Sequence, residues 1–335
     1  MSTRKHIIVG FVMVIALVLS GLTTAGFSQD KYPVRPIQAI CQWRAGSNVD
    51  LALRMLAEPI KEILGQPLVV VVKPGGQGII GQNAMAKAKP DGYTIGLAAL
   101  GPMVTVHLYT PKPPYKMTDF EPICGFYENP GGVGVRRDAP WETLDDFIAD
   151  AKRNPMKYKI GLHVARGPVG MAIKKFILSS GIKVTIVPFA GGTKSRNAVL
   201  SGDVDACALH IGWVLRDPDR LKLLELFEKK RSPQLPDLPT AREKGRDLIM
   251  GARTGFVAPK GTPVDRIRIL ESALKKVITD PGFGKTLFKK LGMAPAFSSH
   301  EEIWEEWQDT YRRFSKIVVE LRKAEKEFKE LQKKK

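Results

Sequence analysis

The sequence predicts an α/β protein with two units, each built on a mostly parallel β-sheet flanked by helices. The chain has 335 residues and 44% hydrophobic content, which is enough for about two domains with apolar cores. Strand-like and helix-like segments alternate along it, and the alternation restarts near residue 130. Strands that alternate with helices at this spacing pair in parallel and are covered by the intervening helices.

The first unit spans roughly residues 32–125. Its helix 50–64 carries apolar residues on one face and ends at Gly65, and Pro59 within it is expected to produce a kink. Residues 68–72 are all apolar, so we expect a buried strand there. The other expected elements are a strand at 36–42, a helix at 79–88 and a strand at 94–99.

The second unit spans roughly residues 130–250. Thr143 and Asp146 have the spacing of a capping box, which predicts a helix through Lys152. The expected elements that follow are a strand at 157–162, a helix at 168–180 closed by Gly181, a strand at 184–189, a helix at 193–200 and a strand at 204–210.

The C-terminal part reads as a strand at 249–258 and three helices. Thr262 is expected to cap the first of these helices, with Pro263 as its first residue, and the second helix ends at Gly292. Ser299 and Glu302 open a long final helix. Its apolar residues recur every three or four positions, at Trp304, Trp307, Tyr311, Phe314, Val318 and Leu321. This stripe predicts packing on the helix's own domain; the alternative is a partner-binding or coiled-coil helix beyond residue 318.

Residues 1–25 have the layout of a secretory signal peptide. Arg4 and Lys5 precede an apolar run at 7–19, and Thr23 and Ala25 occupy the −3 and −1 positions of a cleavage site. A membrane-spanning helix needs about 20 apolar residues, so a signal peptide is favoured over an anchor. We therefore expect a periplasmic protein. The net charge of +18 is then expected to face anionic ligands or membrane components and not nucleic acid.

The sequence predicts no catalytic group, metal site or cofactor. The three cysteines, Cys41, Cys124 and Cys207, are far apart and form no CxxC pair, so free buried thiols are favoured over the one possible disulfide. Residues 76–81 match the GxGxxG pattern, but the next strand is followed by Leu100 and Gly101 without the acid that a dinucleotide site requires. A secreted nucleotide-binding enzyme is therefore kept as an alternative function.

Three loops that join strand ends to helix starts are the candidate ligand site. They span residues 42–50, 163–168 and 189–193. Ligands of α/β proteins bind at the carboxyl ends of strands, and free N–H groups at helix starts attract anions. A cleft for a small anion is one interpretation; the other is that these glycine-containing loops only turn the chain.

At these loops the chain resembles a known family. The ordered motifs are Tyr32-Pro33 with Arg35-Pro36-Ile37, Ala45-Gly46 with Asp50, Arg54 and Leu56-Ala57, Leu64-Gly65-Gln66-Pro67, Pro74-Gly75 with Gly78 and Gly81, Ala86-Lys87-Ala88 with Pro90-Asp91-Gly92-Tyr93-Thr94, Gly191-Gly192, Gly202 with Val204-Asp205, Arg231-Ser232-Pro233, Leu235-Pro236-Asp237 with Pro239-Thr240, and Ala258-Pro259 with Gly261-Thr262-Pro263. This set, from about Tyr32 to residue 318, resembles the substrate-binding receptors of tripartite tricarboxylate transporters, the Bug-type proteins.

The resemblance implies a two-lobed, periplasmic-binding-protein-like fold with a hinge. Lobe 1 would comprise residues 26–128 and 253–335, including the long C-terminal helix, and lobe 2 would comprise 129–252. A monomer would capture a small organic di- or tricarboxylate in the interdomain cleft and deliver it to membrane permease subunits. A receptor that presents its ligand to a membrane sensor is an alternative.

The expected ligand-binding residues come from the strand ends and the loops after them. They are Trp43, Arg44, Ala45, Gly46, Ser47, Asn48 and Asp50; Leu100 and Gly101; His163, Arg166 and Gly167; Ala190, Gly191, Gly192 and Thr193; and His210. The resemblance implies carboxylate binding by backbone amides of the first and third loops. Arg44 and Arg166 depart from the family pattern, and we expect either that they grip a carboxylate or that they point to solvent.

Overall fold

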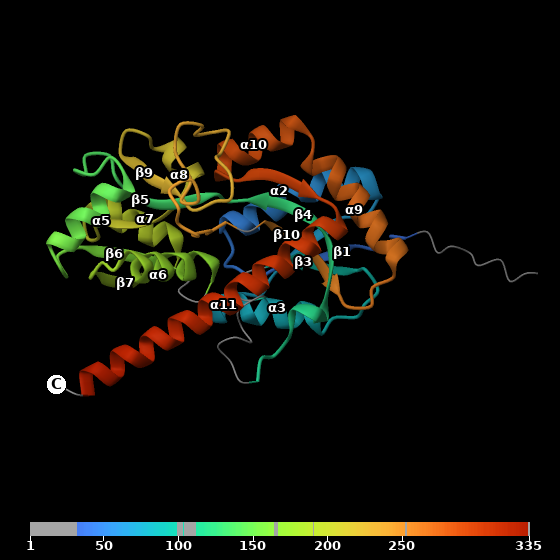
Figure 1. The fold of residues 1–335 in the computed structure, drawn as a ribbon. Helices are drawn as coiled ribbons and strands as arrows, with labels where there is room; N and C mark the ends of the chain where they lie inside the picture. The colour runs from blue at the N-terminus through green and yellow to red at the C-terminus, as the bar shows by residue number, and fades with distance from the viewer. Residues whose placement is uncertain are drawn as a thin grey trace, which may run out of the picture. The chain divides into compact units, whose positions relative to one another are not determined.

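The computed structural model describes residues 32–98, 103, 112–163, 167–189, 191–251 and 253–333 (Figure 1). The predicted signal peptide at 1–25 lies outside these residues. In the part of the chain that is described, no helix is long and apolar enough to cross a membrane.

The first sheet has six strands in the order β11-β4-β10-β3-β1-β2. Their bounds are β1 Ile37–Cys41, β2 Leu68–Val72, β3 Thr94–Leu97, β4 Phe120–Glu128, β10 Thr254–Pro259 and β11 Ala294–Ser298. β1 pairs in parallel with both β2 and β3, as expected, and β10, β4 and β11 extend the sheet with antiparallel pairs.

Helices cover both faces of this sheet. The helices are α2 Asn48–Leu64, α3 Ile79–Ala86, which follows a short 3-10 turn at Gly76–Gly78, α9 Val264–Ile278, α10 Pro281–Leu291 and α11 His300–Lys333. A second 3-10 turn, Met117–Asp119, leads into β4. α2, α9 and α10 contact one another, which places them on one face, whereas α3 and α11 share a buried apolar cluster on the other face.

The second sheet has five strands in the order β7-β6-β8-β5-β9. Their bounds are β5 Gly131–Arg136, β6 Lys159–His163, β7 Thr185–Phe189, β8 Ala206–His210 and β9 Leu221–Leu226, and the helices between them are α5 Leu144–Arg153, α6 Pro168–Ser180, α7 Gly192–Ser201 and α8 Ile211–Arg216. β6 pairs in parallel with β7 and β8, while β5 is antiparallel to β8 and β9.

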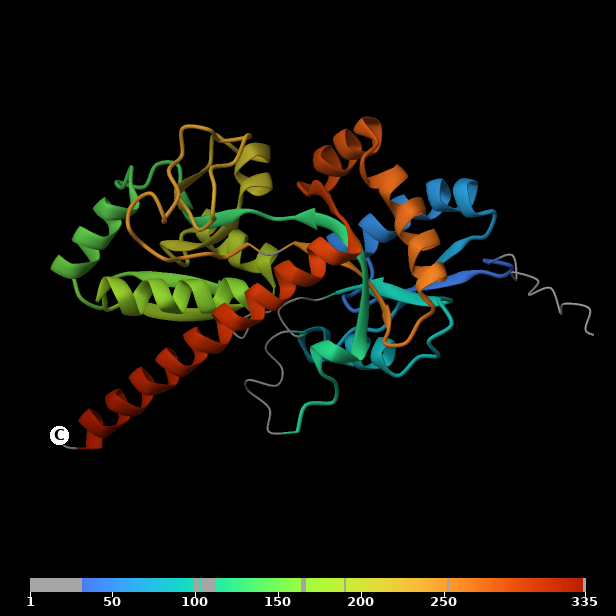
Figure 2. The same ribbon diagram turned by 45° about the vertical axis from the view of Figure 1, so that its right-hand side comes forward.

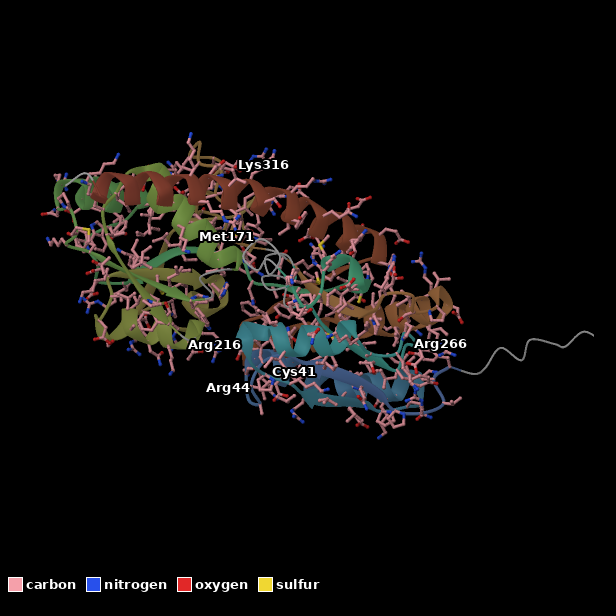
Figure 3. All side chains as sticks on the ribbon, turned by 90° about the horizontal axis from the view of Figure 1, so that it is seen from below. Cys41, Arg44, Met171, Arg216, Arg266 and Lys316 are labelled. Carbon is pink, nitrogen blue, oxygen red and sulfur yellow. The ribbon has the colours of Figure 1, made fainter. Side chains whose placement is uncertain are left out.

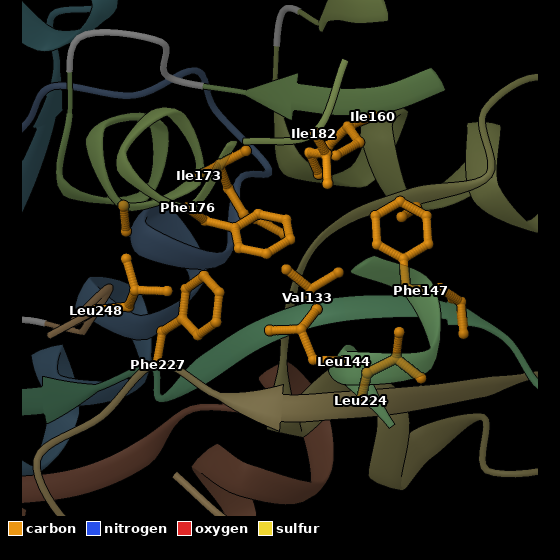
Figure 4. Close-up of a cluster of buried hydrophobic side chains, with 14 of the residues drawn as sticks. Val133, Leu144, Phe147, Ile160, Ile173, Phe176, Ile182, Leu224, Phe227 and Leu248 are labelled. Atoms are coloured by element: carbon orange, nitrogen blue, oxygen red, sulfur yellow. The ribbon is translucent and has the colours of Figure 1, made fainter. Parts of the chain in front are cut away.

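Two apolar clusters hold this sheet between its helices. On one face, Phe147 of α5 and Phe176 of α6 pack with Val133, Ile160 and Phe227 (Figure 4). On the other face, α7 and α8 pack against the side of β8 that carries Cys207 and Leu209. Alternate residues of β8 thus face opposite clusters, as the two-residue period of a strand requires.

Two chain segments connect the sheets. The first runs from the end of β4 at Glu128 to the start of β5 at Gly131, and the second runs from Met250 to the start of β10 at Thr254. Two helix-flanked sheets joined in this way confirm the predicted two-lobed α/β fold class. The expectation of mostly parallel sheets was wrong: both sheets are mixed, because β10, β4 and β11 in the first and β5 and β9 in the second pair antiparallel with their neighbours.

The long helix α11 packs against helices of both sheets, α3 of the first and α6 of the second (Figure 2). Trp307 and Phe314 are buried against lobe-1 residues such as Met85, and the same cluster includes Met171 of α6. The Trp307 indole N–H also donates to the backbone O of Arg253, 2.9 Å away. The predicted apolar stripe therefore packs on the protein itself between Ile303 and Val318.

Most predicted helix ends are confirmed by their capping contacts. Gly65, Gly181 and Gly292 end their helices in the left-handed conformation. Thr143 and Asp146 form the capping box of α5, and Ser299 and Glu302 exchange hydrogen bonds at the start of α11.

Four sequence predictions were wrong in detail. The strand predicted at 249–258 begins only at Thr254, as β10, because the residues before it belong to a segment that connects the two sheets. The strand 68–72 is the sheet's edge, and only Leu68 is buried, because nothing pairs with its outer side in the described sheet. Thr262 does not cap α9; its hydroxyl instead donates to the Pro259 carbonyl, and Pro263 takes the cap position. The α3 helix ends at Ala86, two residues early.

Candidate functional site

The first strand-end loop is held in shape by a buried aspartate. Asp50 is 2% exposed and accepts a hydrogen bond from the Gly46 N–H at 2.9 Å. The Arg54 guanidinium donates to both oxygens of Asp50, at 3.1 and 3.2 Å. Ser47 is the N-cap of α2, and its hydroxyl accepts from the Asp50 N–H. Asp50 thus fixes both the loop and the start of α2.

Asp50 is ionised in this setting. Burial alone would raise the pKa of its carboxyl, but the Gly46 N–H and the Arg54 guanidinium outweigh burial and lower that pKa. The Gly46 N–H is therefore used inside the loop, which leaves it unavailable to a ligand in this conformation.

The first loop and α8 both contact the C-terminal end of α10. The Asn48 side-chain amide donates to the backbone O of Leu291, 3.1 Å away. On the other side, Gly212 lies so close to Gly292 that a side chain at Gly212 would overlap the Gly292 carbonyl. Since Gly212 follows His210 by two residues, this contact brings the first loop and the end of β8 to one place.

The second and third loops place two helix starts at one edge of the second sheet. β6 and β7 are parallel neighbours, so α6 and α7, which follow them, begin at the same edge. The N-cap residues are Gly167 and Gly191, and neither provides a side-chain cap. Among the residues that the structure describes, no side chain caps the first N–H groups of either helix, as an anion site requires.

Three aromatic rings lie beside these helix starts. His163 ends β6, His210 ends β8 and Trp213 lies in α8; their ring centroids are 6.1 Å apart for His163–His210, 6.3 Å for His163–Trp213 and 5.0 Å for His210–Trp213. A side chain at Gly192, the first residue of α7, would overlap the Trp213 ring and come within 3.3 Å of His163 Nε2. The rings therefore border the N-terminus of α7 directly.

One buried polar atom in this area, His163 Nδ1, has no hydrogen-bond partner among the described residues, and its side chain is 4% exposed. The Ser195 hydroxyl, fully buried in the first turns of α7, interacts with the Cys207 thiol. Burial, and secondarily the neighbouring His210, lowers the pKa of His163 to about 3, so its imidazole is neutral.

The predicted site residues fall into three groups. The structure brings together His163, Gly192 and His210 at the edge of the second sheet, with Gly167, Gly191 and Thr193 at the adjoining helix starts. Gly46, Ser47, Asn48 and Asp50 form one hydrogen-bonded loop, which also contains half-buried Trp43, exposed Ala45 and exposed Arg44 (Figure 3). Leu100, Gly101, Arg166 and Ala190 lie outside the described residues.

Sequence reasoning gave no site role to three residues of the candidate site. Trp213 and Ser195 were not singled out, and Arg54 was named only as part of the family motif. The available signal was position: Trp213 comes three residues after a strand end, where α/β ligand sites form. In the residues that the structure describes, no group of three or more His, Cys, Asp or Glu side chains is placed to hold a metal ion.

Solved structures with this fold include periplasmic binding proteins. The periplasmic binding protein BugD is 27% identical, with a TM-score of 0.73, over 86% of this chain and 98% of BugD. MatC from Rhodopseudomonas palustris, solved with bound malate, is 25% identical, with a TM-score of 0.72, over 86% of this chain and all of MatC.

The family follows from the sequence as well. The profile of the tripartite tricarboxylate transporter family receptor matches residues 52–322, so the chain belongs to this family of solute-binding receptors. A UPF0065 protein from the gbd 5' region of Cupriavidus necator is 30% identical over 322 residues, which covers 95% of this chain and 98% of the relative. The resemblance predicted from the motifs is confirmed.

Proposed function

We propose that this protein is an extracytoplasmic receptor that captures a small organic di- or tricarboxylate and delivers it to a tripartite tricarboxylate-type transporter. The observation that carries the proposal is the meeting at the end of α10. There Asn48 of the first loop contacts Leu291, and Gly212, two residues after His210, contacts Gly292. Loops from both sheets thereby flank one place, and closure around a ligand needs this arrangement.

The chemistry of the site favours an anion. The starts of α6 and α7 present N–H groups without side-chain caps, and the positive end of each helix dipole lies at the same edge. Malate, bound by MatC, is a small dicarboxylate and fits such a site.

The ligand-binding residues in this proposal are those predicted from the loops, with one change of role. Gly46 and Asp50 hold the first loop in shape, because their hydrogen bond is made within it. Ala45, Gly191, Gly192 and Thr193 offer backbone N–H groups to the carboxylate. Arg44 is exposed beside the loop and would reach a second carboxylate only on closure.

The proposal includes the division of the chain and its surroundings. Lobe 1 comprises residues 26–128 and 253–335, and lobe 2 comprises 129–252, with the hinge in the two connecting segments. The protein acts as a monomer in the periplasm after removal of residues 1–25, and its partners are the membrane permease subunits.

Native mass spectrometry of the unrefolded protein, followed by thermal shift with organic acids, tests this function. A ligand at one hundred times its Kd adds about 2.7 kcal/mol to the free energy of unfolding. We expect a clear shift with one class of carboxylates and a smaller shift for Arg44→Ala if Arg44 grips the ligand. Equal affinity in Arg44→Ala would remove that residue from the site, and the absence of any shift across the panel would contradict the function.

A further inference from the structure

The chain turns sharply between α5 and β6, at the end of the second sheet that lies away from the candidate site. Lys157 donates its N–H to the Asn154 carbonyl at 3.3 Å, which closes a four-residue turn through Pro155 and Met156. The Met156 N–H donates to the Lys183 carbonyl, 2.8 Å away and just before β7. Because the helix starts of the candidate site follow the carboxyl ends of β6 and β7, this turn marks the opposite, amino end of both strands.

Met156 has a backbone conformation that favours glycine. Its φ is 64°, and among the described residues it is the one residue other than glycine with a positive φ. In turns with proline in the second position, a positive φ in the third position normally selects glycine or asparagine. The Met156 side chain is 59% exposed, so contacts within the protein offset little of this strain. The turn therefore presents a long apolar side chain to solvent at a position where glycine would be easier to accommodate.

The elements that meet at this end of the sheet carry five exposed basic side chains. They are Lys152, Arg153, Lys157, Lys159 and Lys183. Three aspartates belong to the same end, and each is already hydrogen-bonded. Asp150 accepts from three neighbouring side chains, Asp205 accepts from the Lys159 N–H at 2.7 Å, and Asp203 accepts from the Ser201 hydroxyl. This end of the sheet is therefore positively charged.

Two more exposed apolar side chains lie on elements that meet this end. Leu178, in the last turn of α6, is 46% exposed, and Ile186, the second residue of β7, is 39% exposed. Apolar side chains exposed among basic ones match an anionic bilayer, because its surface offers negative headgroups next to an apolar interior. A soluble ligand offers no comparable surface to all three side chains.

We propose that this end of the second sheet docks on an anionic lipid bilayer, with the turn at 154–157 entering the headgroup layer. Met156 is the apolar side chain that enters, and the basic side chains around it bind the anionic headgroups. The contact is reversible, because one apolar side chain and a few lysines bind more weakly than a lipid anchor. It leaves the candidate site accessible, since that site lies at the other end of β6 and β7. It goes beyond the receptor function and does not depend on the identity of the ligand.

Co-sedimentation with lipid vesicles tests the inference. Protein collected after export is used, because the predicted signal peptide at 1–25 would itself enter lipid. Vesicles that contain phosphatidylglycerol are compared with vesicles of pure phosphatidylcholine, at low and at raised salt concentration. We expect binding to the anionic vesicles that salt weakens, and little binding to the neutral ones.

Met156→Gly separates entry of the turn into lipid from the general attraction of a basic protein. It should weaken vesicle binding about 3- to 10-fold. Its melting temperature should not fall, because glycine adopts a φ of 64° without strain. Val264→Ala removes methyl groups from a side chain that is 69% exposed on α9, and it should leave vesicle binding unchanged.

A pair of lysine variants tests the charges. Each basic side chain near an anionic bilayer adds roughly fivefold to binding, so Lys157→Gln with Lys183→Gln should weaken binding about 25-fold. Lys285→Gln with Lys289→Gln removes the same charge from the exposed face of α10 and is the matched control.

Each contrary outcome has a separate meaning. Equal losses in the two lysine pairs overturn the inference, because the attraction would then be that of the whole charged protein. Unchanged affinity in Met156→Gly also overturns it and favours an acidic protein surface as the partner. Absence of binding to the anionic vesicles overturns it outright and leaves the receptor function intact.

Discussion

Replacing Glu228 with glutamine should remove a loss of stability that wild-type protein suffers as the pH rises. Glu228 lies between the two segments that connect the sheets. Its Oε1 accepts from the Gly131 N–H at 3.2 Å, and the Gly251 backbone provides another hydrogen bond. Despite these donors, burial raises the pKa of the Glu228 carboxyl to about 8; Glu128 adds to this rise, and Arg313 opposes it.

The magnitude follows from the difference between 4.5 and about 8. At 1.36 kcal/mol per pH unit, the upper limit is about 5 kcal/mol, and solvent access to the partly exposed side chain reduces it to roughly 2–3 kcal/mol. Below pH 4.5 the carboxyl is protonated in both folded and unfolded chains. Between 4.5 and 8 only the folded chain keeps the proton, so stability falls as pH rises.

Chemical denaturation of wild type and Glu228→Gln at pH 5, 6, 7, 8 and 8.5 measures this effect. The difference in the free energy of unfolding should move in favour of the variant by about 2–3 kcal/mol between pH 5 and 8.5. The amide can also change the free energy of unfolding by an amount that does not depend on pH. That amount cancels, because only the change between pH 5 and 8.5 is compared. Glu305→Gln, on the exposed side of α11, controls for the loss of one negative charge. A difference that stays flat across this range would refute a raised pKa at Glu228.

Three other changes test the site and the long helix. Asp50→Asn should weaken acid binding by about tenfold or more in calorimetry, because the Gly46 and Arg54 contacts lose a charged acceptor worth about 1–3 kcal/mol. Unchanged affinity would show that binding does not depend on the shape of this loop. Gly192→Ala should lower the melting temperature and abolish binding, since the added carbon overlaps Trp213; a variant that binds normally would place the ligand elsewhere. Truncation after Lys323 should leave acid affinity unchanged in calorimetry and reduce pull-down of the permease, whereas equal pull-down would exclude the helix end as the contact.

Local chemistry made the helix ends predictable from sequence. A capping box such as Thr143 with Asp146 acts within four residues, and a left-handed glycine such as Gly181 ends its own helix. These features depend on neighbours in the chain, so the sequence displays them without knowledge of the fold. The same holds for the parallel strands β1, β6 and β8, which are short apolar runs between such helices.

Four strands with antiparallel neighbours, β4, β5, β9 and β11, were not predicted in this way. β5 contains Gly131, Gly132 and Gly134 in six residues, a composition typical of a loop. The glycines are required by distant neighbours: a side chain at Gly132 would overlap the Glu225 carbonyl of β9, and one at Gly134 would overlap Leu209 of β8. Close approach between segments some 75–95 residues apart leaves no local periodic pattern.

The site shows the same division between local and distant information. The loop containing Ser47 and Asp50 could be predicted, because a helix start attracts anions wherever it occurs. The position of the Trp213 ring could not be predicted, because it lies against Gly192, more than twenty residues earlier in the chain, where there is no side chain. A motif search along the sequence does not detect a contact of this kind.

Hydrogen bonds link the two segments that connect the sheets to each other and to α11. Phe227, next to Glu228, donates its N–H to the Gly131 carbonyl and accepts from the Met250 N–H, so this segment joins both connections between the sheets. α11 holds the second connection again, through the Trp307 bond to the Arg253 carbonyl. Any rotation of one sheet against the other must change these bonds or pivot on them. Since α11 also packs on Met171 of α6, the opening and closing that the proposed receptor function needs would require α11 to slide over α6 or move with it.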